Sequence, residues 1–281
     1  MLVEIAIGDA YGAGFENAPE RIIRLHNNLS GYISQPRHSI KAGQYTDDTQ
    51  MSIAVAEAIL SGERWSRRLL ARHFIDAFKR DPREGYARGF FEFLQTVEDE
   101  DDFLRRIRPH SDKSGAAMRA CPIGVFDSVG TVVERATLQA QITHDTPTGT
   151  DAAVAVALMA HYGLYQIGPK SQLDQFIASL VPGPWEGRWS GWVGPRGIDS
   201  AHAALTAVMS NERMTDILRA CVDFGGDTDT VAAMAMGIAS SFEDIEHDLP
   251  AHFVQHLENG QYGRDYLQKL DSALLPGRNP E

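Results

Sequence analysis

The sequence predicts an all-α protein, and three observations lead to that fold class. Four segments repeat apolar, mostly small residues every three to four positions, as buried helices do; they are Met51 to Leu60, Asp151 to Tyr162, Ser200 to Met209 and Val231 to Ala239. No runs of alternating β-branched residues are joined by hairpin turns. Hydrophobic residues make up 43% and charged residues 23% of the 281 positions, so we expect a single globular domain over residues 1–281.

The four apolar helices should pack together at the centre of the fold. Alanine-rich faces let helices approach closely, because no bulky side chain separates the backbones. Capping residues mark their starts: Asp48 or Thr49 for the first, Thr150 or Asp151 for the second, and Asp199 for the third.

Composition and charge exclude several classes of protein. The net charge of −12 argues against unassisted binding to nucleic acid or to an anionic membrane. No apolar run approaches the roughly 20 residues that span a bilayer, and the start, MLVEIAIGDAYG, is unlike a signal peptide. Cys121 and Cys221 lack metal-binding or redox spacing, as expected for buried thiols in a reducing compartment. We expect a cytoplasmic protein, with a monomer as the favoured oligomeric state.

Two segments interrupt the helical pattern. Residues Glu98 to Asp102 form an acidic run, which we interpret as a solvated face or loop. Residues Pro182 to Gly197 combine three tryptophans with glycine and proline, which predicts a long irregular loop. Its indoles either cover the core or form a wall of a ligand site.

The first cluster of candidate functional residues is Thr46-Asp47-Asp48-Thr49, directly before an apolar helix. Adjacent carboxylates repel each other unless positive charge lies between them. One helix cap needs a single such residue, whereas carboxylate and hydroxyl oxygens together are the ligands that Mg²⁺ and Mn²⁺ prefer. This cluster alone leaves capping and metal binding equally open.

A second cluster, Asp227-Thr228-Asp229-Thr230, has the same chemistry and also precedes an apolar helix. Gly225 and Gly226 before it permit unusual backbone angles and a close approach by a ligand. A two-metal centre explains both clusters, because the cations neutralise the carboxylates. We therefore expect the two clusters to meet in the fold.

Other candidate residues have ordinary structural explanations as well. Near the N-terminus, Asp9 could be a helix-end hydrogen-bonding residue, and Glu16 could be a surface charge. Ser114 and Gly115 precede an expected helix start, whose free N–H groups favour a phosphate; an ordinary capped helix is the alternative. Likewise, His144 can be either structural or part of a site.

Taken together, these motifs resemble those of the ADP-ribosylglycohydrolase family. The resemblance covers about residues 3 to 240 and rests on motifs in the family's order: Gly8-Asp9, Gly12 and Glu16; Thr46-Asp47-Asp48-Thr49; Gly115-Ala116-Ala117-Met118-Arg119; Thr143-His144; and Gly225 to Thr230. It implies a compact orthogonal multi-helix bundle with a dimetal centre, Mg²⁺ or Mn²⁺, in a cleft. It also implies cleavage of the C1″ glycosidic bond of ADP-ribosylated proteins or small molecules.

The resemblance also assigns roles to particular residues. It implies that metal is held by Thr46, Asp47, Asp48, Asp227, Asp229 and Thr230. It implies a catalytic role for Glu16 or for a metal-bound carboxylate such as Asp48. Candidate contacts to the substrate are Ser114, Gly115, Met118, Arg119, His144, Gly225 and Gly226. An aromatic residue of the Trp185 to Trp192 loop would stack on adenine.

The chain departs from the family pattern at Lys113-Ser114-Gly115, where many relatives have Gly-Asn-Gly. This departure keeps open a catalytically silent relative that binds ADP-ribose. A second alternative is an all-α metal-dependent phosphohydrolase using His144-Asp145 and His247-Asp248, although that leaves both Asp/Thr clusters unexplained. The acceptor released from ADP-ribose is left open by the sequence.

Overall fold

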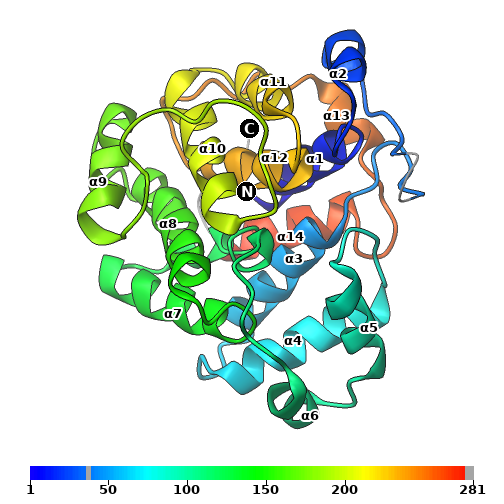
Figure 1. Cartoon of the computed structure of the whole chain (residues 1–281), viewed down its shortest axis with the longest axis vertical. Coiled ribbons are helices and arrows are strands. Elements are labelled where there is room, and N and C mark those ends of the chain that lie inside the picture. Colours follow the sequence, from blue (N-terminus) through cyan, green and yellow to red (C-terminus); the bar gives the residue numbers. More distant parts are fainter. Residues whose placement is uncertain (36–38, 276–281) are drawn as a thin grey trace.

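The computed structural model describes residues 1–35 and 39–275, and these two ranges are folded almost entirely into helices and connecting turns (Figure 1). The α-helices are α1 (Leu2–Ala13), α2 (Glu20–His26), α3 (Asp47–Leu60), α4 (Arg67–Arg80), α5 (Arg88–Thr96), α6 (Glu100–Arg106), α7 (Val129–Gln141), α8 (Pro147–Leu164), α9 (Leu173–Leu180), α10 (Gly197–Ser210), α11 (Met214–Phe224), α12 (Thr228–Ala239), α13 (Ala251–His256) and α14 (Arg264–Leu274). Short 3₁₀ helices are η1 (Ser114–Ala116), η2 (Cys121–Val125) and η3 (Lys170–Gln172). The prediction of an all-α fold is confirmed. None of the helices in the described ranges is long and apolar enough to cross a membrane.

Helices α1 and α12 form the centre of the molecule, with α3, α8, α10 and α11 packed around them (Figure 1). Every residue of α12 and every residue of α1 except Glu4 is buried. The two backbones touch because glycine faces backbone at two successive turns of α1. A Cβ at Gly8 would lie under 3.0 Å from the carbonyl of Ala232, and a Cβ at Gly12 equally close to that of Thr228. Close packing of α1 on α12 therefore fixes the N-terminal end of α12 against the C-terminal half of α1.

The helices begin near the predicted caps but not at them. Helix α3 is capped by Thr46, whose hydroxyl accepts the N–H of Asp48, so both aspartates lie in its first turn. Helix α8 is capped by Thr146 and starts at Pro147, whose fixed φ suits a first helical position. Helix α10 starts at Gly197, ahead of Asp199.

The two irregular segments behave differently from each other. The acidic run is only partly exposed to solvent. Asp99 caps α6, and the buried Asp102 forms ion pairs with Arg105 and Arg106. The tryptophan-rich stretch between α9 and α10 is a long irregular loop, as expected.

The contact between α1 and α12 generates a stability prediction. Gly8→Ala should lower the free energy of unfolding by about 1–3 kcal/mol, because the added methyl group overpacks against the backbone of Ala232. Urea unfolding monitored by circular dichroism measures this change. Gly130→Ala is the matched control: it lies in α7 with nothing within 4 Å of the added Cβ, so it should be neutral or stabilise slightly. Equal stabilities for the two variants would contradict the packing argument.

Candidate functional site

A cavity of about 860 Å³ opens where the N-terminal ends of α3 and α12 approach the segment after α1. Acidic residues and one threonine from three separate segments line it: Glu16, Asp47, Asp48, Asp227, Asp229 and Thr230. Thr46 lies fully buried beneath them. The fold thus brings both Asp/Thr clusters and Glu16 to a single cavity.

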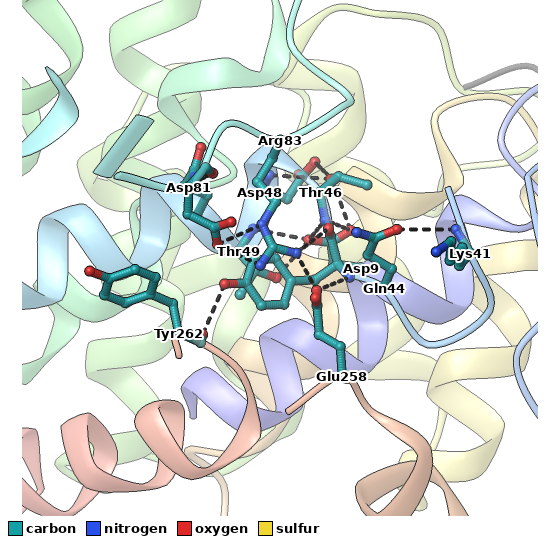
Figure 2. Close-up of polar contacts among 12 residues, drawn as sticks. Asp9, Lys41, Gln44, Thr46, Asp48, Thr49, Asp81, Arg83, Glu258 and Tyr262 are labelled. Carbon is teal, nitrogen blue, oxygen red and sulfur yellow. Dashed lines mark hydrogen bonds and ion pairs between the residues drawn. The ribbon is translucent and has the colours of Figure 1, made fainter. Parts of the chain in front are cut away.

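Asp9 of α1 holds the start of α3 in place (Figure 2). Its carboxylate accepts the backbone N–H of Thr46 at 2.9 Å and that of Thr49 at 3.0 Å. It also accepts both threonine hydroxyls, at 2.9 Å and 2.6 Å. Burial raises the pKa of Asp9 to about 6, although the hydrogen bonds from Thr49 and Thr46 act in the opposite direction. Sequence reasoning left Asp9 as a helix-end residue, and the structure instead makes it the support of the first cluster.

Asp48 is buried, and only one of its two carboxylate oxygens accepts a hydrogen bond among the described residues. It is 3% exposed, and its Oδ2 accepts a long hydrogen bond of 3.3 Å from the hydroxyl of Thr46. Its other oxygen, Oδ1, is buried without a hydrogen-bond partner among the described residues. A buried carboxylate oxygen left in this way is costly.

The second cluster lies at the start of α12. Asp229 accepts the backbone N–H of Thr230 at 3.0 Å, and Asp227 accepts the hydroxyl of Ser200 at 3.4 Å. The side chain of Thr230 lowers the pKa of Asp227 and also that of Asp48, so it lies near carboxylates of both clusters. Thr230 therefore marks the point at which the two clusters meet.

The carboxyl groups of the cavity raise one another's pKa. Burial raises the pKa of Asp48 well above the ordinary value, and the charges of Asp47 and Asp9 add to that effect. Burial also raises the pKa of Asp229, with Glu16 and Asp48 contributing. Each carboxylate therefore favours either a proton or a cation in its vicinity.

The chemistry of this cavity fits hard divalent cations. Carboxylate and hydroxyl oxygens are the preferred ligands of Mg²⁺ and Mn²⁺, and the unpartnered Oδ1 of Asp48 needs a positive group. Within residues 1–35 and 39–275, no three acidic, histidine or cysteine side chains are already arranged to hold one ion. The fit therefore lies in charge and donor type, and binding requires side-chain adjustment.

The predicted substrate contacts fall into three groups. Ser114, Gly115 and Met118 line the cavity beside the carboxylates, and the side chain of Ser114 lowers the pKa of Asp227. Ser114 begins the short 3₁₀ helix η1, where a longer helix start was expected.

Gly225 and Gly226 form the second group, and they lie outside the cavity lining. A Cβ at Gly226 would collide with the carbonyl of Val193, and both glycines have positive φ. Val193 Nα–H donates to the carbonyl of Gly225 at 3.2 Å. These glycines therefore hold the tryptophan-rich loop against the start of α12, which is a packing reason for their presence.

Arg119 and His144 are connected through Thr143. The Arg119 guanidinium is 1% exposed, lies 4.3 Å over the ring of Phe74, and donates to Gln139 and to the hydroxyl of Thr143. That hydroxyl lies 2.7 Å from Nδ1 of His144. Burial, aided by the charge of Arg119, lowers the pKa of His144 to about 3, so this ring is neutral at physiological pH. Both side chains border the cavity, but Arg119 donates its hydrogen bonds to Gln139 and Thr143 inside the protein.

Aromatic and cationic side chains that sequence reasoning did not single out complete the cavity wall. Helix α5 and the turn before it contribute Tyr86, Phe90 and Phe93, Arg106 is the last residue of α6, and Arg108 follows that helix. The amphipathic pattern of α5 was the available signal. Of the loop tryptophans, Trp192 borders the cavity and is 61% exposed, whereas Trp185 is fully buried with its N–H on the carbonyl of Val181.

The residues of the alternative phosphohydrolase site do not come together. His144 borders the cavity, but His247 and Asp248 are not part of its lining. Asp248 instead accepts the hydroxyl of Thr215 and an ion pair from Arg213. The two His-Asp pairs therefore serve separate parts of the fold.

Comparisons with known proteins relate the chain to one family. The family model described as ADP-ribosylglycohydrolase matches residues 1–280. ADP-ribosylhydrolase ARH3 of Xenopus tropicalis is 24% identical over 96% of this chain and 93% of its own length. ADP-ribosylarginine hydrolase Tri1 of Pseudomonas putida is 23% identical over 98% of this chain and 76% of its own.

A solved structure has the same fold. The chain described as an ADP-ribosylglycohydrolase-related protein complex superposes with a TM-score of 0.71 at 21% identity. The match covers 97% of this chain and 94% of that one.

The crowding of carboxylates predicts that one substitution stabilises the metal-free protein. Asp48→Asn keeps the shape of the side chain and removes one buried negative charge. In chelator at pH 8 it should raise the free energy of unfolding by about 0.5–3 kcal/mol, the range typical of single substitutions, because the buried charge that Asp47 and Asp9 repel is removed. Urea unfolding measures this, with Asp76→Asn on the exposed face of α4 as the control.

The effect of Asp48→Asn should depend on pH with a definite sign. A pKa raised in the folded state means that the folded protein binds protons more readily than the unfolded chain. The wild type therefore gains stability as the pH falls from 8 toward the ordinary aspartate pKa of about 4, and the advantage of the variant shrinks. A variant less stable than the wild type at pH 8 would contradict the prediction that Asp48 is destabilised by repulsion from neighbouring carboxylates.

Proposed function

This chain belongs to the ADP-ribosylglycohydrolase family and is an enzyme that hydrolyses ADP-ribosyl linkages, and we propose that its acidic cavity performs this hydrolysis with two bound divalent cations, Mg²⁺ or Mn²⁺. The proposed ligands are Thr46, Asp47, Asp48, Asp227, Asp229 and Thr230. The products are ADP-ribose and the free acceptor, a protein side chain or a small molecule.

One observation carries the proposal: carboxylates of two Asp/Thr clusters separated by about 180 residues of sequence line one cavity, and one oxygen of Asp48 is buried without a hydrogen-bond partner among the described residues. Hydrogen bonding alone would satisfy the carboxylates with donors from the protein. Here the carboxyl groups instead raise one another's pKa. Such a concentration of negative charge in a ligand cavity is consistent with cation binding.

When bound, the cations would offset the carboxylate charges, hold the ribose hydroxyls and lower the pKa of a nearby water. The protein's own contribution begins with Asp9, which orients the first cluster through the N–H groups of Thr46 and Thr49. The hydroxyl of Ser200 similarly donates to Asp227 at 3.4 Å, and the nearby Ser114 side chain lowers the pKa of that carboxyl. The ligands are thus held by a second layer of contacts, as metal sites require.

A carboxylate must also handle protons as the C1″ bond breaks. Cleavage at the anomeric carbon passes through a transition state with positive character on the sugar. Glu16 is half-buried at the cavity edge, and Asn17 donates to its Oε1 at 3.1 Å. We assign Glu16 or Asp48 as the general acid or base, because both carboxylates adjoin the same space.

The remaining walls suit the rest of ADP-ribose. Lys113 and Arg108 supply positive charge for the diphosphate near Ser114 and Gly115. Trp192 replaces the buried Trp185 as the loop residue that could stack on adenine, and Phe90 with Phe93 offers a second apolar surface.

A direct assay of ADP-ribosylated substrates identifies the acceptor. Because one relative is named an ADP-ribosylarginine hydrolase, ADP-ribosylarginine is the first substrate to test here, followed by ADP-ribosylserine and small-molecule conjugates. Free ADP-ribose is detected in the presence of Mg²⁺ or Mn²⁺.

The double variant Asp47→Ala/Asp229→Ala should abolish metal-dependent release of ADP-ribose, with a loss of at least about 1,000-fold, because each cluster loses a cation ligand. Chromatographic detection of ADP-ribose measures the rate. Asp76→Ala on exposed α4 is the control and should retain wild-type turnover.

Two results would reject the proposal in different ways. Unimpaired turnover by the double variant would exclude the assigned ligands. Tight binding of ADP-ribose by calorimetry, with no hydrolysis of any substrate at any metal concentration, would instead identify a silent binding relative.

A further inference from the structure

Tyr45, the residue immediately before the first cluster, is held at every polar group by two distant segments. Its backbone N–H donates to Glu258 at 2.9 Å, and its carbonyl accepts from Arg83 at 3.4 Å. Its hydroxyl donates to the carbonyl of Tyr262 at 2.9 Å. The position of Tyr45 therefore depends on the segment after α4 and on the segment between α13 and α14.

Arg83 lies at the centre of these contacts. Its guanidinium is 3.9 Å from the centre of the Tyr45 ring, and it forms ion pairs with Glu258 and Asp81. Arg83 is 8% exposed although it carries a full charge. A buried, stacked and doubly paired arginine has one allowed placement, because the planar guanidinium fixes the direction of each hydrogen bond.

The same loop touches the cluster a second time. Gly85, two residues after Arg83, lies against the carboxylate of Asp47, so closely that a Cβ at this position would collide with Oδ1. The next residue, Tyr86, donates its hydroxyl to Gln50 of α3 at 2.7 Å. Arg83 thus controls the chain on both sides of Asp47, through Tyr45 before it and through Gly85 against it.

Glu258, in the C-terminal segment, contacts Arg83 and Tyr45 from outside the lining of the cavity. Glu258 Nα–H donates to the carbonyl of Gly43 at 2.9 Å, and its carboxylate binds both Arg83 and Tyr45. Yet no residue after Thr230 in the described chain lines the cavity. Any influence of Glu258 on the reaction must therefore pass through the orientation of Asp47 and Asp48.

We propose that Arg83 and Glu258 are a positioning pair that orients Asp47 and Asp48, so that the C-terminal segment controls the affinity of the cavity for its cations. This inference rests on the dimetal site proposed above. It adds that two residues outside the lining of the acidic cavity set the geometry of the first ligands.

The test compares Arg83→Gln with Arg80→Gln. Arg80 is the matched control: it is also paired with a carboxylate, Glu57, and lies over the ring of Tyr262 at 4.1 Å. Titration of the metal-free proteins with Mn²⁺ by calorimetry should show about 10- to 100-fold weaker binding by Arg83→Gln and less than about a twofold change for Arg80→Gln. Arg83→Lys should recover part of the affinity, since it keeps the charge but loses the planar contacts.

A second measurement does not depend on metal. Hydrogen–deuterium exchange of the metal-free proteins should accelerate in residues 44–50 for Arg83→Gln and not for Arg80→Gln. Should Arg83→Gln fail to fold, Glu258→Gln is the milder variant; it keeps an acceptor for Tyr45 and should weaken Mn²⁺ binding severalfold.

Wild-type Mn²⁺ affinity together with unchanged exchange in folded Arg83→Gln would overturn the positioning role. Equal losses in Arg83→Gln and Arg80→Gln would also overturn it, because the effect would then be a general loss of stability. Failure of the proposed function has a different signature: the wild type itself binds no Mn²⁺, while faster exchange in Arg83→Gln still supports the positioning pair.

Discussion

The buried carboxylate of Asp9 is the contact on which the rest of the cavity depends. It satisfies the free N–H groups at the start of α3 from a neighbouring helix, so the direction of α3 is tied to that of α1. Helix α1 is in turn fixed on α12 by contacts that only glycine permits. Two helix starts that carry acidic residues are thereby held together by one central helix.

This arrangement concentrates repulsion where function requires charge. The carboxylates of both clusters are buried and raise one another's pKa, so they repel one another electrostatically. The surrounding apolar packing is extensive, and it compensates for that cost. Placing the charges on the first turns of α3 and α12, rather than on free loops, keeps them from separating to relieve their repulsion. A cation then becomes the most favourable partner available to them.

Much of this organisation could be read from the sequence. Apolar periodicity predicted α12 and three helices packed around it, α3, α8 and α10, but not the central helix α1. The repeated Asp/Thr chemistry predicted that residues near positions 47 and 229 would meet. Contacts between distant segments could not be read in the same way. Arg83 and Glu258 are 175 residues apart, and nothing in the local pattern of either segment indicates the other. Nor could the sequence distinguish a buried Arg119 from an exposed one, since its burial depends on Phe74 and Gln139 from two other helices. Gly225 and Gly226 were read as ligand contacts because the same backbone freedom serves a loop crossing and a bound phosphate equally well.

The tryptophan-rich loop gives the protein a built-in optical signal. Trp65 and Trp189 hold their indole N–H groups on backbone carbonyls, and Trp185 is fully enclosed. Trp192 differs from these three, because it is 61% exposed and borders the cavity. The indole of this side chain fluoresces in contact with solvent, and a ligand that covers it would exclude water from the ring. Occupancy of the cavity can therefore be followed in unlabelled protein by intrinsic fluorescence, against a background from three indoles fixed elsewhere.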